Sequence, residues 1–170
     1  MKTGMNEGLR KPYRMWFGLY EGQLLERVFL FYPAYALWLR NTLNKPSTQN
    51  IVKHIDWCIA ELDEKKIQTK CTACRRPATR FSVFVGDWNP WPFCDKCDPF
   101  AGGADPSKII VFDKVEEMLK ILQHYPSHTK RDVRKIVQGV AYAKGFSKPR
   151  TEKKIIEFFH DGVGLDNELH

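Results

Sequence analysis

Cys71-Thr-Ala-Cys74 and Cys94-Asp-Lys-Cys97 are the two short stretches that decide the fold in the middle of this 170-residue chain. Each Cys-x2-Cys pair places two thiols on one tight turn, and nineteen residues separate the pairs. A tetrahedral metal ion accepts two such turns, so the spacing predicts one structural Zn2+ ion bound by four thiolates. Four thiolates fill the coordination shell, and we therefore expect the ion to hold the fold without doing chemistry.

Other interpretations of the four cysteines remain open from the sequence. The thiols can be oxidised to disulfides or be unrelated, and an iron ion takes the same four ligands. The chain begins Met-Lys-Thr-Gly-Met-Asn-Glu-Gly, with no hydrophobic signal core, which predicts a cytoplasmic protein. Disulfides rarely persist in a reducing cytosol, so a metal site is preferred to disulfides.

The residues between the two cysteine pairs predict a hairpin. Thr79-Arg-Phe-Ser-Val-Phe-Val85 alternates as a strand does, and Pro90 and Pro92 exclude a helix in the turn that follows. Lys108-Ile-Ile-Val-Phe112 predicts a further short strand that pairs with this hairpin. A hairpin with a two-cysteine turn before it and after it indicates a zinc-ribbon or treble-clef-like unit.

Helical patterns lie on both sides of this unit, so the predicted fold class is α+β. Asp113 is expected to cap one helix, and Thr129 or Ser127 another. The expected helices cover residues 33–43, 47–66, 113–122, 129–145 and 151–160.

The N-terminal part predicts a small hairpin followed by a helix. Gly18 and Gly22 punctuate short apolar runs as turns do. In the helix that starts at Pro33, the residues Leu37, Trp38 and Leu43 are expected in a buried stripe. The whole chain then divides into a flexible leader (1–12), a hairpin-and-helix module (13–67), a zinc-binding ribbon (68–112) and a basic helical region (113–170).

The net charge of +7 is concentrated in one stretch. Residues 124–154 contain nine Lys or Arg and two Asp or Glu, a balance of +7, whereas residues 1–123 carry +4 and residues 155–170 carry −4. A concentrated positive field predicts a surface for a polyanion. A solvated helix face is the alternative for such a charge run.

The predicted helix over residues 129–145 separates this charge from its apolar side chains. Valines and isoleucines fall on one face and basic residues on the other, with Gln138 and Tyr142 among the charges. We therefore predict that this helix and the basic turn after it contact phosphates of DNA or RNA. The predicted contact residues are Lys130, Arg131, Arg134, Lys135, Lys148 and Arg150.

Three further patterns qualify this expectation. Trp88 and Trp91 in the hairpin turn can stack on exposed bases, or they can close over the zinc hairpin. The last two helices are similar to a helix-turn-helix, but their connection, residues 145–150, is longer than the usual turn. The longest apolar run, residues 28–39, is interrupted by Pro33 and too short to span a bilayer, so no membrane partner is expected.

The N-terminal part also resembles a known family. The resemblance is carried by Phe17-Gly18-x-Tyr20-x-Gly22, Leu25, Val28 and Pro33-x-Tyr35-x-x-Trp38-Leu39, within about 30 of the 170 residues. They resemble the small domain at the C-terminal end of exodeoxyribonuclease X-like proteins, which also occurs as a stand-alone module in phage and bacterial proteins. The family commonly has basic residues beside its first Tyr, where this chain has Leu19 and Glu21. The resemblance does not include the nuclease itself.

The expected function is non-catalytic binding of nucleic acid by a zinc-containing protein. The sequence has no paired carboxylates with metal spacing and no nucleotide-binding loop, which makes an enzyme the weakest hypothesis. His54 and Cys58 lie four residues apart, but a lone thiol among isoleucines is usually a small buried hydrophobe. The alternative function is a protein-interaction adaptor whose ribbon docks on a larger nucleic-acid-processing enzyme.

Overall fold

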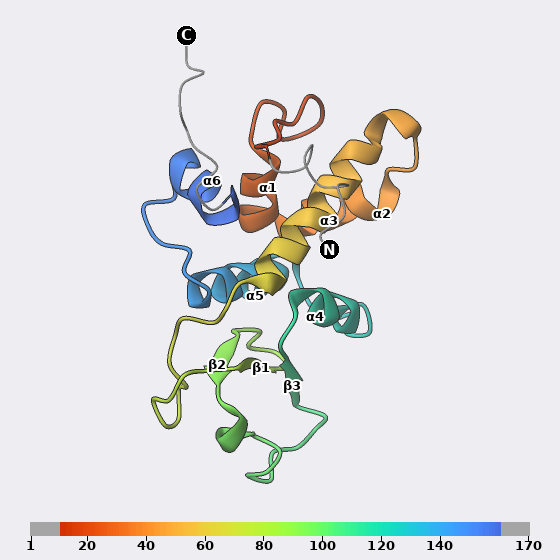
Figure 1. Ribbon diagram of the computed structural model, residues 1–170. Helices are drawn as coiled ribbons and strands as arrows, with labels where there is room; N and C mark the ends of the chain where they lie inside the picture. Colours follow the sequence, from red (N-terminus) through yellow and green to blue (C-terminus); the bar gives the residue numbers. More distant parts are fainter. Residues whose placement is uncertain (1–10, 161–170) are drawn as a thin grey trace, which may run out of the picture.

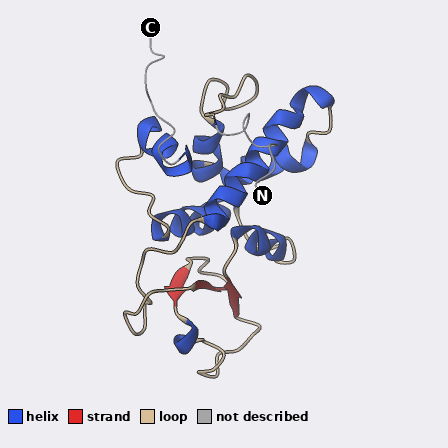
Figure 2. Cartoon of the chain, viewed as in Figure 1, coloured by secondary structure: helices blue, strands red, loops and turns tan. Residues whose placement is uncertain are grey.

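The described part of the chain is a group of helices with a small sheet at one end (Figure 2). The structure is a computed structural model that describes residues 11–160, so residues 1–10 of the predicted leader lie outside it. The α-helices are α1 (Leu25–Phe31), α2 (Pro33–Thr42), α3 (Gln49–Glu64), α4 (Val115–Leu122), α5 (Lys130–Ala143) and α6 (Glu152–His160). The strands are β1 (Arg80–Phe84), β2 (Trp91–Phe93) and β3 (Ile109–Phe112), and two short 3-10 helices are η2 (Pro46–Thr48) and η3 (Asp95–Cys97). The predicted α+β class is confirmed.

One hydrophobic core joins helices from both ends of the chain. Helix α1 contacts α2, α3, α5 and α6, and α3 also contacts α4 (Figure 1). Phe29 of α1, Ile55 of α3 and Val137 of α5 are fully buried in this one cluster. Residues of the predicted N-terminal module and of the basic C-terminal region therefore share a core, because each amphipathic helix needs a partner for its apolar face.

The three strands form an antiparallel sheet in the order β2-β1-β3. The register pairs Phe81 with Phe112, whose rings stack 5.5 Å apart inside the helical core. On the opposite face of the sheet, Phe93 and Val111 pack against the cysteines. The sheet thus lies between the helical core and the cysteine cluster, and both predicted strands are present.

Helix α5 packs against the turn between β1 and β2. A Cβ atom at Gly139 would lie 2.4 Å from Cγ of Pro90, so glycine permits a close approach that a side chain would block. Near this contact, Nζ of Lys135 donates to the carbonyl oxygen of Asp87 at 2.9 Å. The sheet is therefore fixed to the same helix that carries the predicted phosphate contacts.

The caps of two helices show one confirmed and one wrong prediction. Thr129 caps α5 as predicted, and its side chain exchanges hydrogen bonds with Asp132 in a capping box. Asp113 does not cap α4. Instead, the carboxylate of Asp63 at the end of α3 accepts a hydrogen bond from the backbone N–H of Val115 at 2.6 Å. A cap supplied from so far along the chain leaves no local sequence signal.

The buried stripe of α2 also differs from the prediction. The Trp38 side chain is 54% exposed, whereas Ala36 and Leu39 are completely buried. Leu37 and Leu43 are half-buried. Helix α2 therefore packs on its neighbours through a face with a small residue at its centre, and its largest side chain faces solvent.

Residues 14–24 form a closed loop rather than a two-stranded hairpin. An isolated antiparallel bridge joins Arg14 to Leu24, and α1 begins at the next residue. Gly18 and Gly22 have φ values of 85° and 81°, which agrees with their predicted role in turns. The loop returns the chain so that its aromatic residues lie beside α2.

A buried carboxylate joins three helices of the core. Oε1 of Glu26 lies 2.9 Å from Nε2 of His54 and 2.8 Å from Nε2 of His160, which connects α1 to α3 and α6. All three side chains are buried. Burial by itself raises the pKa of Glu26, but the hydrogen bonds of His160 and His54 outweigh burial and lower this pKa to about 2.

We predict that Glu26→Gln removes part of the acid sensitivity of folding. A carboxylate whose pKa falls from 4.5 unfolded to about 2 folded stabilises the protein above pH 4.5, and that contribution is lost as the pH falls toward 2. The full effect is about 3 kcal/mol. Urea unfolding at pH 6 and pH 3 measures it, and the wild type should lose more stability between these two pH values than the Glu26→Gln variant. Equal losses would show that Glu26 is not the group responsible.

Candidate functional site

The first cysteine turn is held by its own backbone. The N–H of Arg75 donates to the carbonyl oxygen of Cys71 at 3.0 Å. Arg75 has a φ of 65°, the left-handed conformation, so the chain reverses direction directly after Cys74. Both thiols of the pair therefore project from one turn, as the Cys-x2-Cys spacing predicts.

The second cysteine turn contains η3 and is anchored to β1. The N–H of Cys97 donates to the carbonyl oxygen of Cys94 at 3.0 Å. The carboxylate of Asp95 accepts a hydrogen bond from Oγ1 of Thr79 at 2.8 Å and forms an ion pair with Arg80. These contacts place the second turn beside the first.

The structure brings together the four sulfur atoms that the sequence predicts as metal ligands. The Sγ atoms of Cys71, Cys74, Cys94 and Cys97 all lie within 4.8 Å of one another, and all four cysteines are free thiols. Ligands held tetrahedrally about 2.3 Å from one zinc ion are about 3.8 Å apart, so the cluster has the size of a metal site. These four cysteines can hold one metal ion, and the disulfide alternative is not what the structure contains.

The four thiols of the cluster affect one another's protonation. Burial raises the pKa of the Cys71 thiol, but hydrogen bonds from the backbone of Cys74, Cys94 and Ala73 outweigh it and lower this pKa to about 6. The pKa of Cys97 rises to about 12, chiefly because of its hydrogen bond with Cys74. Neighbouring thiols compete for negative charge, and a metal ion is what allows four thiolates to coexist.

The fifth cysteine lies apart from this cluster. Cys58 of α3 is completely buried, and burial raises the pKa of its thiol well above the ordinary value. His54 lies four residues earlier, but its Nε2 is engaged with Glu26. A buried, protonated thiol is a poor nucleophile, so the structure does not support a Cys–His nucleophile pair.

Three of the six residues predicted to contact phosphate lie in one groove. The groove has a volume of about 510 Å3 and runs between the N-terminal half of α5 and the aromatic residues of the N-terminal part. Among residues 11–160, three cations and no acidic residue line it. We call it the aromatic–basic groove, and its lining residues are Leu19, Tyr20, Phe31, Tyr32, Ala34, Tyr35, Trp38, Lys130, Arg131 and Arg134.

The other three predicted contact residues lie outside the groove lining. Lys135 is turned toward the sheet, where it is bonded to the turn after β1. The guanidinium of Arg150, in the connection between α5 and α6, lies 5.4 Å from the centre of the Phe31 ring. Lys148 is exposed in the connection between α5 and α6. The predicted set is thus divided among the groove, the sheet contact of Lys135 and the connection between α5 and α6.

Four aromatic side chains form one wall of the aromatic–basic groove, and we call Tyr20, Tyr32, Tyr35 and Trp38 the aromatic wall. The Tyr20 ring stacks on Tyr32 with centroids 4.3 Å apart and meets Tyr35 edge to face at 5.0 Å. Tyr35 stacks on Trp38 at 5.6 Å. Burial raises the pKa of Tyr20, and the positive charge of Arg134 opposes that rise. Tyr20 of the aromatic wall therefore lies close enough to Arg134 for the two side chains to interact electrostatically.

The loop of residues 14–24 fixes the position of Tyr35 in this wall. The hydroxyl of Tyr35 accepts a hydrogen bond from the N–H of Leu19 at 3.3 Å. A Cβ atom at Gly18 would lie 2.5 Å from that hydroxyl, so the contact requires glycine. The sequence predicts a buried position for Trp38 and contains no signal that places Tyr20 or Tyr35 beside α5.

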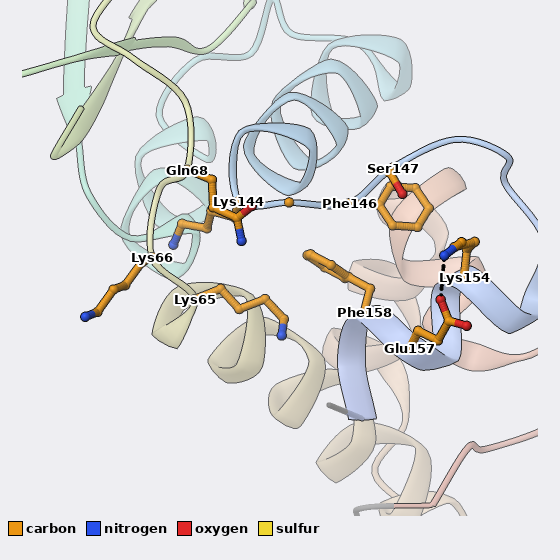
Figure 3. A pocket seen from close by; sticks show the side chains of 10 residues that line it. Lys65, Lys66, Gln68, Lys144, Phe146, Ser147, Lys154, Glu157 and Phe158 are labelled. Atoms are coloured by element: carbon orange, nitrogen blue, oxygen red, sulfur yellow. Dashed lines mark hydrogen bonds and ion pairs between the residues drawn. The ribbon is translucent and has the colours of Figure 1, made fainter. Parts of the chain in front are cut away.

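A second recess contains two lysines, Lys144 and Lys154, whose amines bond to neighbouring parts of the fold. It has a volume of about 400 Å3 and lies where the ends of α3 and α5 meet α6 (Figure 3). Nζ of Lys144 donates to the carbonyl oxygen of Leu62 at 2.9 Å. Lys154 forms an ion pair with Glu157 at 2.8 Å (Figure 3). These interactions close the C-terminal end of α3 and stabilise α6, so we assign the recess a structural role.

The two tryptophans of the hairpin turn have different environments. Trp88 is buried and packs edge to face on Tyr125 with ring centroids 5.8 Å apart. Trp91 is 44% exposed at the start of β2. Trp88 therefore belongs to the core, and only Trp91 has a surface that can meet a partner.

Comparison with known proteins adds no family to these observations: no family model, no curated protein and no solved structure matches the chain. Within residues 11–160, none of the helices combines the length and the apolar character needed to cross a membrane. The site is therefore interpreted from its own residues.

We predict that the purified protein binds one metal ion per chain through the cysteine cluster. Cys74→Ser removes one of four ligands and should lower the metal content from about one ion per chain to well below half an ion, since tetrahedral thiolate sites need all four ligands. Elemental analysis of the dialysed protein measures this content. Cys58→Ala is the matched control, because this thiol lies outside the cluster, and it should keep the metal. Equal metal contents in the two variants would rule out the site.

Proposed function

We propose that this protein is a zinc-containing nucleic-acid-binding protein that acts without catalysis. The observation that carries the proposal is the aromatic–basic groove, where Lys130, Arg131 and Arg134 face the aromatic wall. Phosphate groups bind arginine and lysine, and bases pack on aromatic rings. The proposed target is DNA or RNA.

The position of the cations on α5 supports this proposal. Arg131 and Arg134 are exposed and one helical turn apart, so both reach the same side of the helix. Val133, Ile136 and Val137 hold the opposite side of α5 in the core. A rigid helix therefore presents these guanidinium groups, and less freedom is lost on binding than from a mobile tail.

We propose zinc as the metal and a zinc-ribbon-like role for residues 68–112. A structural ion fixes the two cysteine turns, and through β1 and β2 it supports the turn on which Gly139 packs. Zinc bound to four thiolates has no visible absorption, whereas iron in the same ligands does. A colourless protein that contains zinc is the expected result, and a coloured protein that contains iron would overturn this choice.

We also propose that the N-terminal part is related to the small C-terminal domain of exodeoxyribonuclease X-like proteins. Three of the four residues of the aromatic wall, Tyr20, Tyr35 and Trp38, are among the residues that carry this resemblance. Gly18, which also carries it, admits the Tyr35 hydroxyl, and Tyr35 stacks on Trp38. A motif that builds a binding wall would explain why glycines and aromatic residues occur together at fixed offsets.

We predict that Arg131→Glu with Arg134→Glu weakens nucleic-acid binding at least tenfold. Charge reversal removes two phosphate contacts and adds repulsion. Fluorescence anisotropy of a labelled oligonucleotide between 50 and 200 mM salt measures the affinity. For three phosphate contacts with a single strand, the slope of log K against log salt should be about −2, and the variant should have a smaller slope.

The control for this experiment is the pair Lys53→Glu and Lys108→Glu, which changes the net charge equally at exposed positions outside the groove. A loss confined to the α5 variant supports the proposal. An equal loss in both variants would mean that only the total charge matters, and absence of wild-type binding at 50 mM salt would remove the proposal.

A second function, an adaptor for a larger nucleic-acid-processing enzyme, is favoured by one observation. Phe84 and Trp91 are 47% and 44% exposed on the face of the sheet turned away from the helical core. Exposed aromatic residues on a small rigid unit are typical of protein docking sites. This proposal predicts that a partner protein stays bound after nuclease treatment of the lysate and is lost with Phe84→Ser and Trp91→Ser. Loss of the partner on nuclease treatment would exclude it.

A further inference from the structure

The aromatic–basic groove has the size of a site for a small planar ligand unit. Its volume of about 510 Å3 lies within the roughly 300–1,000 Å3 of ordinary ligand sites. It lies between residues far apart in the sequence, since one wall comes from residues 19–38 and the other from α5. The groove therefore exists only in the folded protein and has defined walls.

The aromatic wall leaves the Trp38 ring partly exposed to solvent. Trp38 is 54% exposed, although Tyr35 stacks on it and Tyr35 is in turn held by Tyr20 and the Leu19 N–H. A large apolar side chain loses favourable burial when half of it faces solvent. The braced Trp38 ring is therefore a preformed surface on which another planar group can stack, with little entropy left to lose.

The opposite wall supplies positive charge close to that ring surface. Lys130, Arg131 and Arg134 lie in the first two turns of α5 and line the groove. Among residues 11–160, no acidic side chain belongs to this lining. The complementary ligand thus combines a planar ring with an adjacent anion.

Each nucleotide of an unpaired strand has this combination, a base and a phosphate. In a duplex the bases are stacked on one another, and their faces cannot reach a side chain such as Trp38. An acidic peptide has carboxylates but no planar ring beside each carboxylate. It can therefore pair with the basic side chains, but it has no group that stacks on the aromatic wall. The combination of groups therefore selects among anionic polymers.

We propose that the aromatic–basic groove binds single-stranded nucleic acid, with one base stacked on Trp38 and the neighbouring phosphates held by Arg131 and Arg134. This inference rests on the proposed function, because it names the strand class bound at the same groove. It also assigns a binding role to the N-terminal residues that the charge pattern alone does not indicate.

The test compares a 15-nucleotide deoxythymidine strand with a hairpin duplex of about equal phosphate number, each labelled and titrated by fluorescence anisotropy. Wild type is expected to bind the single strand at least tenfold more tightly. Trp38→Leu keeps an apolar side chain but removes the ring, and it should weaken single-strand binding by about 5- to 150-fold, the range for one lost stack. Trp38→Phe should restore much of that loss. Duplex binding should change less than twofold in either variant.

The control is Trp16→Leu, because Trp16 is 55% exposed, as Trp38 is, but lies outside the groove. Unchanged thermal unfolding of each variant shows that folding is intact. If wild type binds neither nucleic acid, the proposed function fails and this inference fails with it. If it binds duplex as tightly as single strand, or if Trp38→Leu binds like Trp16→Leu, the proposed function stands and this inference is overturned. Displacement of the single strand by polyglutamate at equal charge concentration would also overturn it.

Discussion

The burial of one face of α5 is the constraint on which the rest of the structure depends. Val133, Ile136, Val137 and Val140 are buried, and α5 contacts both α1 and α2. Each such side chain contributes roughly 1.5–3 kcal/mol when it leaves water, so the rotation of α5 about its axis is fixed. Once that rotation is fixed, Arg131 and Arg134 lie on the side of α5 that lines the groove.

The buried ionic cluster of Glu26 has a complementary role in the helical core. Two histidines connect Glu26 of α1 to α3 and to α6. Buried carboxylates are costly unless they are fully hydrogen-bonded, and such clusters favour one arrangement of helices over others. In this protein, the favoured arrangement places α1 and α6 side by side, although they come from opposite ends of the chain.

The cysteine cluster lies away from the groove but is connected to it through α5. The sheet between the cysteines and the core is fixed to α5 by the close contact of Gly139 with Pro90 and by the Lys135 hydrogen bond. Glycine inside a helix costs roughly 1 kcal/mol relative to alanine, so the helix gives up stability for this packing. The sheet with its cysteine cluster is thus a support for the helix and is separate from the groove surface.

The features that depend on neighbouring residues could be predicted from the amino-acid pattern alone. The doubled Cys-x2-Cys spacing identified the four clustered thiols, period-two alternation identified β1, and the Thr129 cap and apolar period identified α5 with its basic face. Only the tertiary structure decided that Trp38 faces solvent, that Asp63 caps α4, and that the aromatic wall meets Arg131 and Arg134. The physical reason is that local patterns specify which face of a helix is apolar, whereas the partner of that face depends on packing between residues about a hundred positions apart in the chain.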